Sequence, residues 1–127
     1  MRVKPDRRLV LKEIEGAKSD LAEAKDSFGE GKFKWAIIQA YYAMFHAARA
    51  LVYSKGFREK SHHALLVALR HLFARELEVE FFESFEDAMD LREEADYRLT
   101  FSEEGATSVI SGAEKFLNRA RSILKIG

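Results

Sequence analysis

Cysteine is absent from the 127-residue sequence, and turn-forming residues are scarce: there is one Pro, at position 5, and there are seven Gly. The absence of cysteine excludes disulfide bonds, thiolate zinc sites and thiol nucleophiles, and it is compatible with a reducing compartment. A β-rich domain needs turn residues about every 8–12 positions. The composition therefore predicts an all-α protein, whose core can draw on the 12% of residues that are aromatic.

Long apolar runs are also missing. The amino-terminal segment, MRVKPDRRLVLKEIE, is charged and has no apolar run long enough for a signal peptide. The most apolar stretch, residues 35–56, approaches the length of a membrane span, but Gln39, His46 and Arg49 interrupt it. Such groups are costly inside a bilayer. We therefore expect a cytoplasmic protein that does not enter the membrane.

Residues 35–56 predict a helix that is apolar on nearly every side. Helical spacing places one apolar stripe on Trp35, Ile38, Tyr42, Phe45 and Val52. It places a second stripe, beside the first, on Ile37, Tyr41, Met44, Ala48 and Leu51. A surface helix needs only one such stripe. We expect this helix to be enclosed by neighbouring helices or by a second subunit.

Hydrophobic periodicity predicts five helices in all. The first ends near Gly29, the second is the apolar segment, and the third begins at Ser61, a good N-cap. The fourth covers roughly residues 81–97, and the fifth follows Ser102. No repeat or linker divides the chain. We predict one domain, residues 1–127, folded as an up-and-down antiparallel bundle of about five helices.

The net charge is zero, but the charges are unevenly distributed. Residues 49–75 contain six basic side chains and one acidic side chain, whereas residues 76–104 contain two basic and twelve acidic ones. This asymmetry indicates either ordinary solvated helix faces or a surface that uses charge to attract a partner or a second copy.

Two polar groups within the apolar helix are candidates for chemistry. His46 and Arg49 are three residues apart and share a helix face, and Tyr42 lies one turn before His46. Such a group can bind phosphate or take part in proton transfer. The alternative is a hydrogen-bonded polar layer that fixes the register of packed helices, to which Gln39 would also belong.

A second candidate lies in the loop and helix start SKGFREKSHH, residues 54–63. Arg58 and Lys60, with Lys55, precede the helix that begins near Ser61. A helix amino terminus with adjacent basic residues favours an anion such as phosphate, although an ordinary solvated loop fits the same residues. The adjacent histidines 62 and 63 point about 100° apart on a helix, so they cannot grip one ion, and we predict no metal site.

A third candidate lies at the end of the fourth predicted helix. Arg92 and Asp96 are four residues apart on one face, and Tyr97 follows. This spacing fits a surface ion pair. Near the next turn it also allows Arg92 and Tyr97 to open into a cleft between helices. No phosphate-binding glycine loop, HExxH motif or Ser nucleophile with an arranged base is present, so spacing alone defines no activity.

The segments AYYAMFHAARALVYSKG (residues 40–56) and LREEADY (residues 91–97) closely resemble the HEPN family (higher eukaryotes and prokaryotes nucleotide-binding), in particular its small stand-alone prokaryotic members. The resemblance covers nearly the whole chain. It implies a helical bundle that commonly forms homodimers and is coupled to a small nucleotidyltransferase partner, in several cases as toxin and antitoxin. We expect no cofactor. Many members are metal-independent endoribonucleases that use an Arg followed, after four to six residues, by a His.

This chain departs from that Arg–His pattern. Arg92 matches the family Arg, but Asp96 and Tyr97 stand where a His is expected, and no His follows His71. Tyr has a reference pKa near 10 and is a poor base at neutral pH. Arg58 and His63 have the family spacing, yet they precede the third helix, which is the wrong place.

Three hypotheses follow from the sequence. The first is a binding and interaction module for nucleotide or RNA phosphate, with Arg92, Asp96 and Tyr97 at the site and His46 and Arg49 as a supporting layer. The second is a ribonuclease toxin with a variant site of Arg92, Asp96 and Tyr97, or one that borrows His46 across a dimer. The third is a purely structural dimer whose acidic fourth helix docks on a basic partner.

Overall fold

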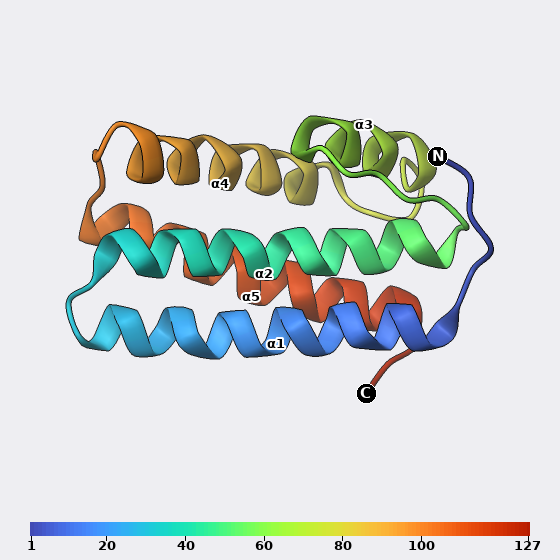
Figure 1. Cartoon of the computed structure of the whole chain (residues 1–127), viewed down its shortest axis with the longest axis horizontal. Coiled ribbons are helices and arrows are strands. Elements are labelled where there is room, and N and C mark those ends of the chain that lie inside the picture. Colours follow the sequence, from blue (N-terminus) through green and yellow to red (C-terminus); the bar gives the residue numbers. More distant parts are fainter.

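The computed structural model describes residues 1–127 and contains five helices and no strand beyond one isolated bridge between Arg2 and Phe57. The helices are α1 (Arg7–Gly29), α2 (Phe33–Ser54), α3 (His62–Leu72), α4 (Val79–Tyr97) and α5 (Glu103–Leu124). The four long helices alternate in direction along the bundle, and the short α3 lies beside α4 and α2 (Figure 1). The predicted all-α antiparallel bundle is confirmed.

The helix ends follow from local chemistry. Asp6, Ser61 and Ser102 are the N-caps of α1, α3 and α5, and each side chain accepts a hydrogen bond from a backbone N–H in the first turn of its helix. Gly31 and Gly56 follow α1 and α2 with φ of 75° and 82°, a left-handed conformation that favours glycine. The second and fourth helices each begin two residues earlier than the sequence predicts.

The second helix is enclosed, as its two apolar stripes predict. Helix α2 contacts each of the other four helices, and 13 of its 22 residues are buried. Six of these are fully buried alanines, whose small side chains let the neighbouring helices approach closely: Ala36, Ala40, Ala43, Ala47, Ala48 and Ala50. Trp35 departs from the prediction, with half of its surface exposed, because it lies in the first turn of α2 at the end of the bundle (Figure 1).

One hydrophobic cluster of 35 buried residues draws on all five helices. Its largest fully buried side chains include Tyr41 of α2, Phe85 of α4 and Phe116 of α5. None of the helices combines the length and the hydrophobicity that a membrane span requires. Polar side chains at the edge of this core, where α2 meets α1 on one side and α3 and α4 on the other, form the two clusters described next.

Candidate functional site

Arg92 of α4 points its guanidinium into a group of three tyrosines. The guanidinium carbon lies 5.6 Å from the ring centroids of both Tyr41 and Tyr42, and 5.5 Å from that of Tyr97. The first two rings come from α2 and the third from the last residue of α4. Only 11% of the Arg92 side chain is exposed. The geometry is that of a cation held among aromatic rings, an arrangement that stabilises positive charge.

The charge of Arg92 is only partly balanced by polar partners. One terminal nitrogen donates a hydrogen bond to the Tyr42 hydroxyl at 3.2 Å, and the Asp96 carboxylate lies 3.8 Å from the same nitrogen. The Nε atom is buried and has no hydrogen-bond partner. At 3.8 Å, the predicted ion pair of Arg92 and Asp96 is a long one. A guanidinium that is buried this far with one distant carboxylate retains capacity to bind an anion.

His62, the first residue of α3, lies against the same tyrosines. Its ring is stacked on Tyr41 with centroids 5.5 Å apart and planes 19° apart, and it lies 4.6 Å from the ring of Phe45. The Tyr41 hydroxyl and His62 Nδ1 are hydrogen-bonded. Burial lowers the pKa of His62, and the nearby positive charge of Arg92 lowers it further. His62 is therefore neutral near pH 7.

Tyr41 and His62 were not predicted as site residues. Burial raises the pKa of Tyr41 well above its ordinary value, so its hydroxyl stays protonated and can donate to His62 Nδ1. The sequence contains the paired tyrosines and the paired histidines, but these segments are distant along the chain. Only the packing of α3 on α2 and α4 brings them together, so no local spacing signalled the contact.

Tyr97 and the residues that follow it are the open side of this cluster. Tyr97 is 72% exposed, and Leu99 and Phe101 in the connection to α5 are 67% and 47% exposed. Leu99 adopts a left-handed backbone conformation with φ of 54°, which is unfavourable for a branched side chain. The site therefore borders a stretch of exposed apolar surface where α4 ends.

His46 and Arg49 lie on the other side of α2 and face α1. His46 Nδ1 lies 2.7 Å from one carboxylate oxygen of Glu13, and Arg49 lies 3.5 Å from the other. His46 Nε2 is also 3.5 Å from Asp20, whose pKa is raised by burial. These contacts link α1 to α2, as the predicted polar layer requires. Tyr42, which sequence spacing grouped with His46 and Arg49, is instead bonded to Arg92.

Gln39 does not share this layer, because its side chain lies 2.7 Å from the Ser27 hydroxyl at the other end of α1. Arg58 and Lys60 are exposed in the loop before α3. Arg58 lies over the ring of Tyr53 with its guanidinium carbon 5.9 Å from the centroid, and Arg49 lies over the same ring at 5.8 Å. Lys60 precedes the N-cap of α3 by one residue. These basic groups are thus distributed around α2 and α3 rather than gathered at Arg92.

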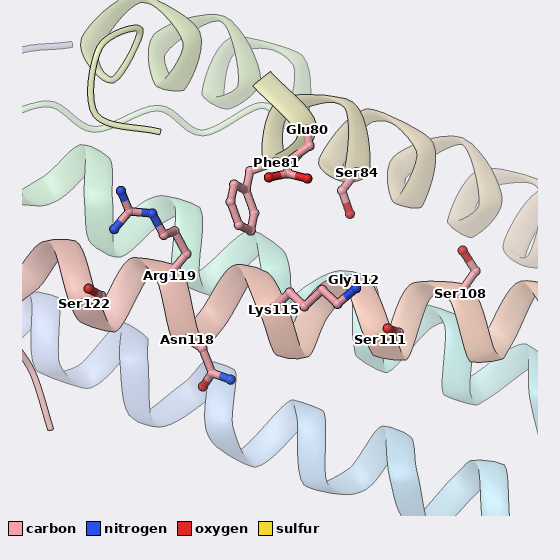
Figure 2. Close-up of a pocket in the computed structure, with 10 residues that line it drawn as sticks. All are labelled: Glu80, Phe81, Ser84, Ser108, Ser111, Gly112, Lys115, Asn118, Arg119 and Ser122. Carbon is pink, nitrogen blue, oxygen red and sulfur yellow. The ribbon is translucent and has the colours of Figure 1, made fainter. Parts of the chain in front are cut away.

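The largest hollow in the molecule lies apart from the Arg92 cluster. It is an open groove of about 690 Å³ between α4 and α5, where Glu80, Phe81 and Ser84 face small residues of α5 (Figure 2). Its two cations are Lys115 and Arg119. Arg119 is already bound to Glu78, with contacts of 3.0–3.1 Å to the carboxylate. No group of three or more His, Asp or Glu side chains is placed to hold a metal ion.

Comparison with known proteins places this helical bundle in a defined family. The family profile described as "HEPN domain" matches residues 11–124, so the chain belongs to the HEPN family. The chain is similar to two Methanocaldococcus jannaschii proteins. It is 34% identical over 115 residues to the one named "Putative toxin MJ0605", which covers 88% of this chain and 86% of that protein. It is 30% identical over 122 residues to "Putative toxin MJ0142", with 93% and 83% covered.

A further relative, "UPF0332 protein" of Archaeoglobus fulgidus, is 32% identical over 114 residues, which cover 86% of this chain and 90% of that protein. The fold also matches the crystal structure of TT1696 from Thermus thermophilus. That match has a TM-score of 0.78 at 20% identity and covers 89% of this chain and 96% of the other. At that identity the similarity extends to the fold alone. The family resemblance in the sequence is confirmed.

Proposed function

We propose that this HEPN protein binds a nucleotide or RNA phosphate at Arg92, as a cytoplasmic homodimer that works with a small nucleotidyltransferase in a toxin–antitoxin-like pair. The observation that carries the proposal is the environment of Arg92. Its guanidinium is largely buried among three tyrosines, and its one carboxylate neighbour is 3.8 Å away. A phosphate oxygen would supply the charge and the hydrogen-bond acceptor that the protein itself supplies only in part.

Each residue at this site has a distinct role in the proposal. Arg92 contacts the phosphate, and Asp96 orients the guanidinium from the next turn of α4. Tyr97, which is 72% exposed beside Arg92, stacks on a base or donates a hydrogen bond to the ligand. The layer of Glu13, His46 and Arg49 holds α1 against α2 behind the site.

Binding of a short single-stranded RNA, followed by fluorescence anisotropy, tests the proposal. We expect Arg92→Ala to weaken binding at least about tenfold, because a charge-assisted hydrogen bond contributes about 1.5–3 kcal/mol. Arg75→Ala is the matched control, because Arg75 is an exposed arginine between α3 and α4, at the far end of α4 from Arg92, and forms no ion pair. If Arg92→Ala and the wild type bind RNA equally, Arg92 is not the phosphate ligand and the proposal is wrong.

The partner and dimer parts of the proposal need separate measurements. Light scattering of the purified chain gives the oligomeric state, and a homodimer is expected. The small nucleotidyltransferase, if encoded beside this chain, should co-purify with it. Because the exposed Tyr97 phenol is open to modification, transfer of a nucleotide to it by the partner should appear as a mass increase that Tyr97→Phe abolishes. A chain that is monomeric and does not bind such a partner contradicts the dimer and partner parts of the proposal.

A second candidate function is metal-independent RNA cleavage. Two relatives carry the word toxin in their names, and a neutral histidine lies beside Arg92, which is the type of group that proton transfer requires. Incubation of the protein with RNA in EDTA separates the two functions. Products that end in 2′,3′-cyclic phosphate and are lost with Arg92→Ala would favour the enzyme, whereas intact RNA favours binding alone.

A further inference from the structure

His62 and Arg92 share two aromatic neighbours although they belong to different helices. The His62 ring centroid lies 5.5 Å from that of Tyr41 and 6.0 Å from that of Tyr42. The guanidinium carbon of Arg92 lies 5.6 Å from each of the same two centroids. One pair of tyrosines on α2 thus supports both an imidazole from α3 and a guanidinium from α4. Arg92 also lies close enough to lower the pKa of His62, so the two basic groups are neighbours in one cluster.

The imidazole of His62 is held in a fixed orientation. Its Nδ1 is hydrogen-bonded to the Tyr41 hydroxyl, and its ring packs against the rings of Tyr41 and Phe45. Since the buried Tyr41 remains a phenol, it can donate to Nδ1, and the ring proton then resides on Nε2. The Nε2 atom has no hydrogen-bond partner within the chain and is not among the buried atoms that lack one. A donor is therefore available at the surface of the cluster.

We propose that His62 is the second phosphate-recognition group of the Arg92 site, with Nε2 donating to an oxygen of a nucleotide or RNA phosphodiester. This inference rests on the proposed function and adds a residue from another helix to it. It also gives the buried Tyr41 phenol a role, which is to orient the imidazole of His62 rather than to bind the ligand itself. The late part of the chain has no histidine, and α3 supplies one.

The charged groups around His62 predict the direction in which ligand affinity changes with pH. The groups that face it are Tyr41 and Tyr42 from α2, Arg92 and Glu93 from α4, and the adjacent His63. In the free protein, burial and Arg92 together outweigh Glu93 and lower the pKa of His62. A bound phosphodiester brings negative charge and opposes that shift. Binding and protonation of His62 therefore favour each other, and affinity rises as the pH falls.

The deoxydinucleotide d(ApA) is the appropriate probe, because its single phosphodiester keeps one negative charge across this pH range and it has no 2′-hydroxyl to react. Binding is measured from pH 8 to pH 5.5. We expect the wild-type affinity to rise severalfold over this range, toward the limit of about tenfold that one pKa unit of coupling sets. H62Q should bind more weakly and lose most of this pH dependence. H63Q is the matched control, since His63 is exposed and adjacent, and should behave as wild type.

The outcomes separate this inference from the function on which it rests. If R92A abolishes binding while H62Q matches the wild type at every pH, the role of His62 is wrong and the proposed function stands. If the wild type binds neither d(ApA) nor RNA, the proposed function itself fails. Should H62Q not fold, the His62 ring is titrated by NMR in the wild type, with His63 as internal reference. A rise in the His62 pKa on addition of d(ApA) supports the inference, and an unchanged value overturns it.

Discussion

Two arginines, Arg49 of α2 and Arg92 of the neighbouring α4, have similar surroundings but different charge partners. Arg49 and Arg92 both lie against aromatic rings, and both have a buried Nε without a hydrogen-bond partner. Arg49 is 23% exposed and faces Glu13, which also binds His46 at 2.7 Å. Arg92 is 11% exposed, and its only carboxylate neighbour, Asp96, is 3.8 Å away. The more deeply buried cation thus has the weaker partner.

The difference separates a structural cluster from a candidate site. In the Glu13 cluster, one carboxylate serves two basic side chains of α2, and the contacts tie α1 to α2. In the Arg92 cluster, tyrosine rings and one hydroxyl substitute for a carboxylate. Burial of a poorly paired charge lowers stability unless other interactions offset it. A protein that retains such a group at its surface edge next to an exposed tyrosine has the features of a ligand site.

Removal of the Glu13 charge should give the largest loss of stability. Glu13→Gln leaves His46 and Arg49 partly buried without their shared carboxylate, and we expect the free energy of unfolding to fall by about 2 kcal/mol. Urea unfolding at pH 7 measures the change. The control is Glu15→Gln, since Glu15 lies on the same helix with a side chain that is 72% exposed and contacts only Lys18. If the two substitutions lower stability equally, the structural role assigned to Glu13 is wrong.

Substitution of each arginine by methionine tests the comparison directly. Methionine keeps an apolar stem of similar length and removes the charge. Arg49→Met leaves Glu13 with His46 but without its arginine partner, and it should lower the free energy of unfolding by about 1–2 kcal/mol. Arg92→Met removes a poorly paired cation from among tyrosines, so the lost cation–ring contacts and the removed desolvation cost should nearly cancel, within about 1 kcal/mol. The same Arg92→Met protein should lose RNA binding. A larger destabilisation from Arg92→Met than from Arg49→Met would reverse the assignment.

Much of this fold is predictable from the sequence because its signals are local. Few turn residues and a three-four apolar spacing specify helices, and two stripes on one segment specify its central position. Spacing also placed His46 and Arg49 on one face. It could not supply Glu13, which comes from another helix, and it assigned Tyr42 to the wrong cluster because the next helix decides which neighbour a side chain meets.

The candidate site was only partly predictable for the same reason. Arg92, Asp96 and Tyr97 lie within two turns of one helix, so spacing identified them. His62 and Tyr41 come from α3 and α2, and their contact depends on how the short α3 packs. The sequence showed that a histidine was missing after Arg92. It contained no local pattern to indicate that one from an earlier helix lies beside it.

Alkaline unfolding gives a smaller effect that distinguishes Tyr41 from Tyr97 within the Arg92 cluster. Burial raises the pKa of Tyr41 above its ordinary value of 10.0, so in the folded state it holds its proton more tightly than in the unfolded chain. This contribution to stability is complete below about pH 10 and is lost as the pH rises further, by up to about 1.4 kcal/mol per pH unit.

Tyr41→Phe should lower the free energy of unfolding by about 1 kcal/mol at pH 8 through loss of the bond to His62. The stability of this variant should then fall less steeply between pH 10 and 11 than that of the wild type. Tyr97→Phe, which changes an exposed ring, should retain the wild-type slope. Urea unfolding at each pH measures both slopes, and a Tyr41→Phe protein as steep as the wild type would show that Tyr41 is not the buried phenol that orients His62.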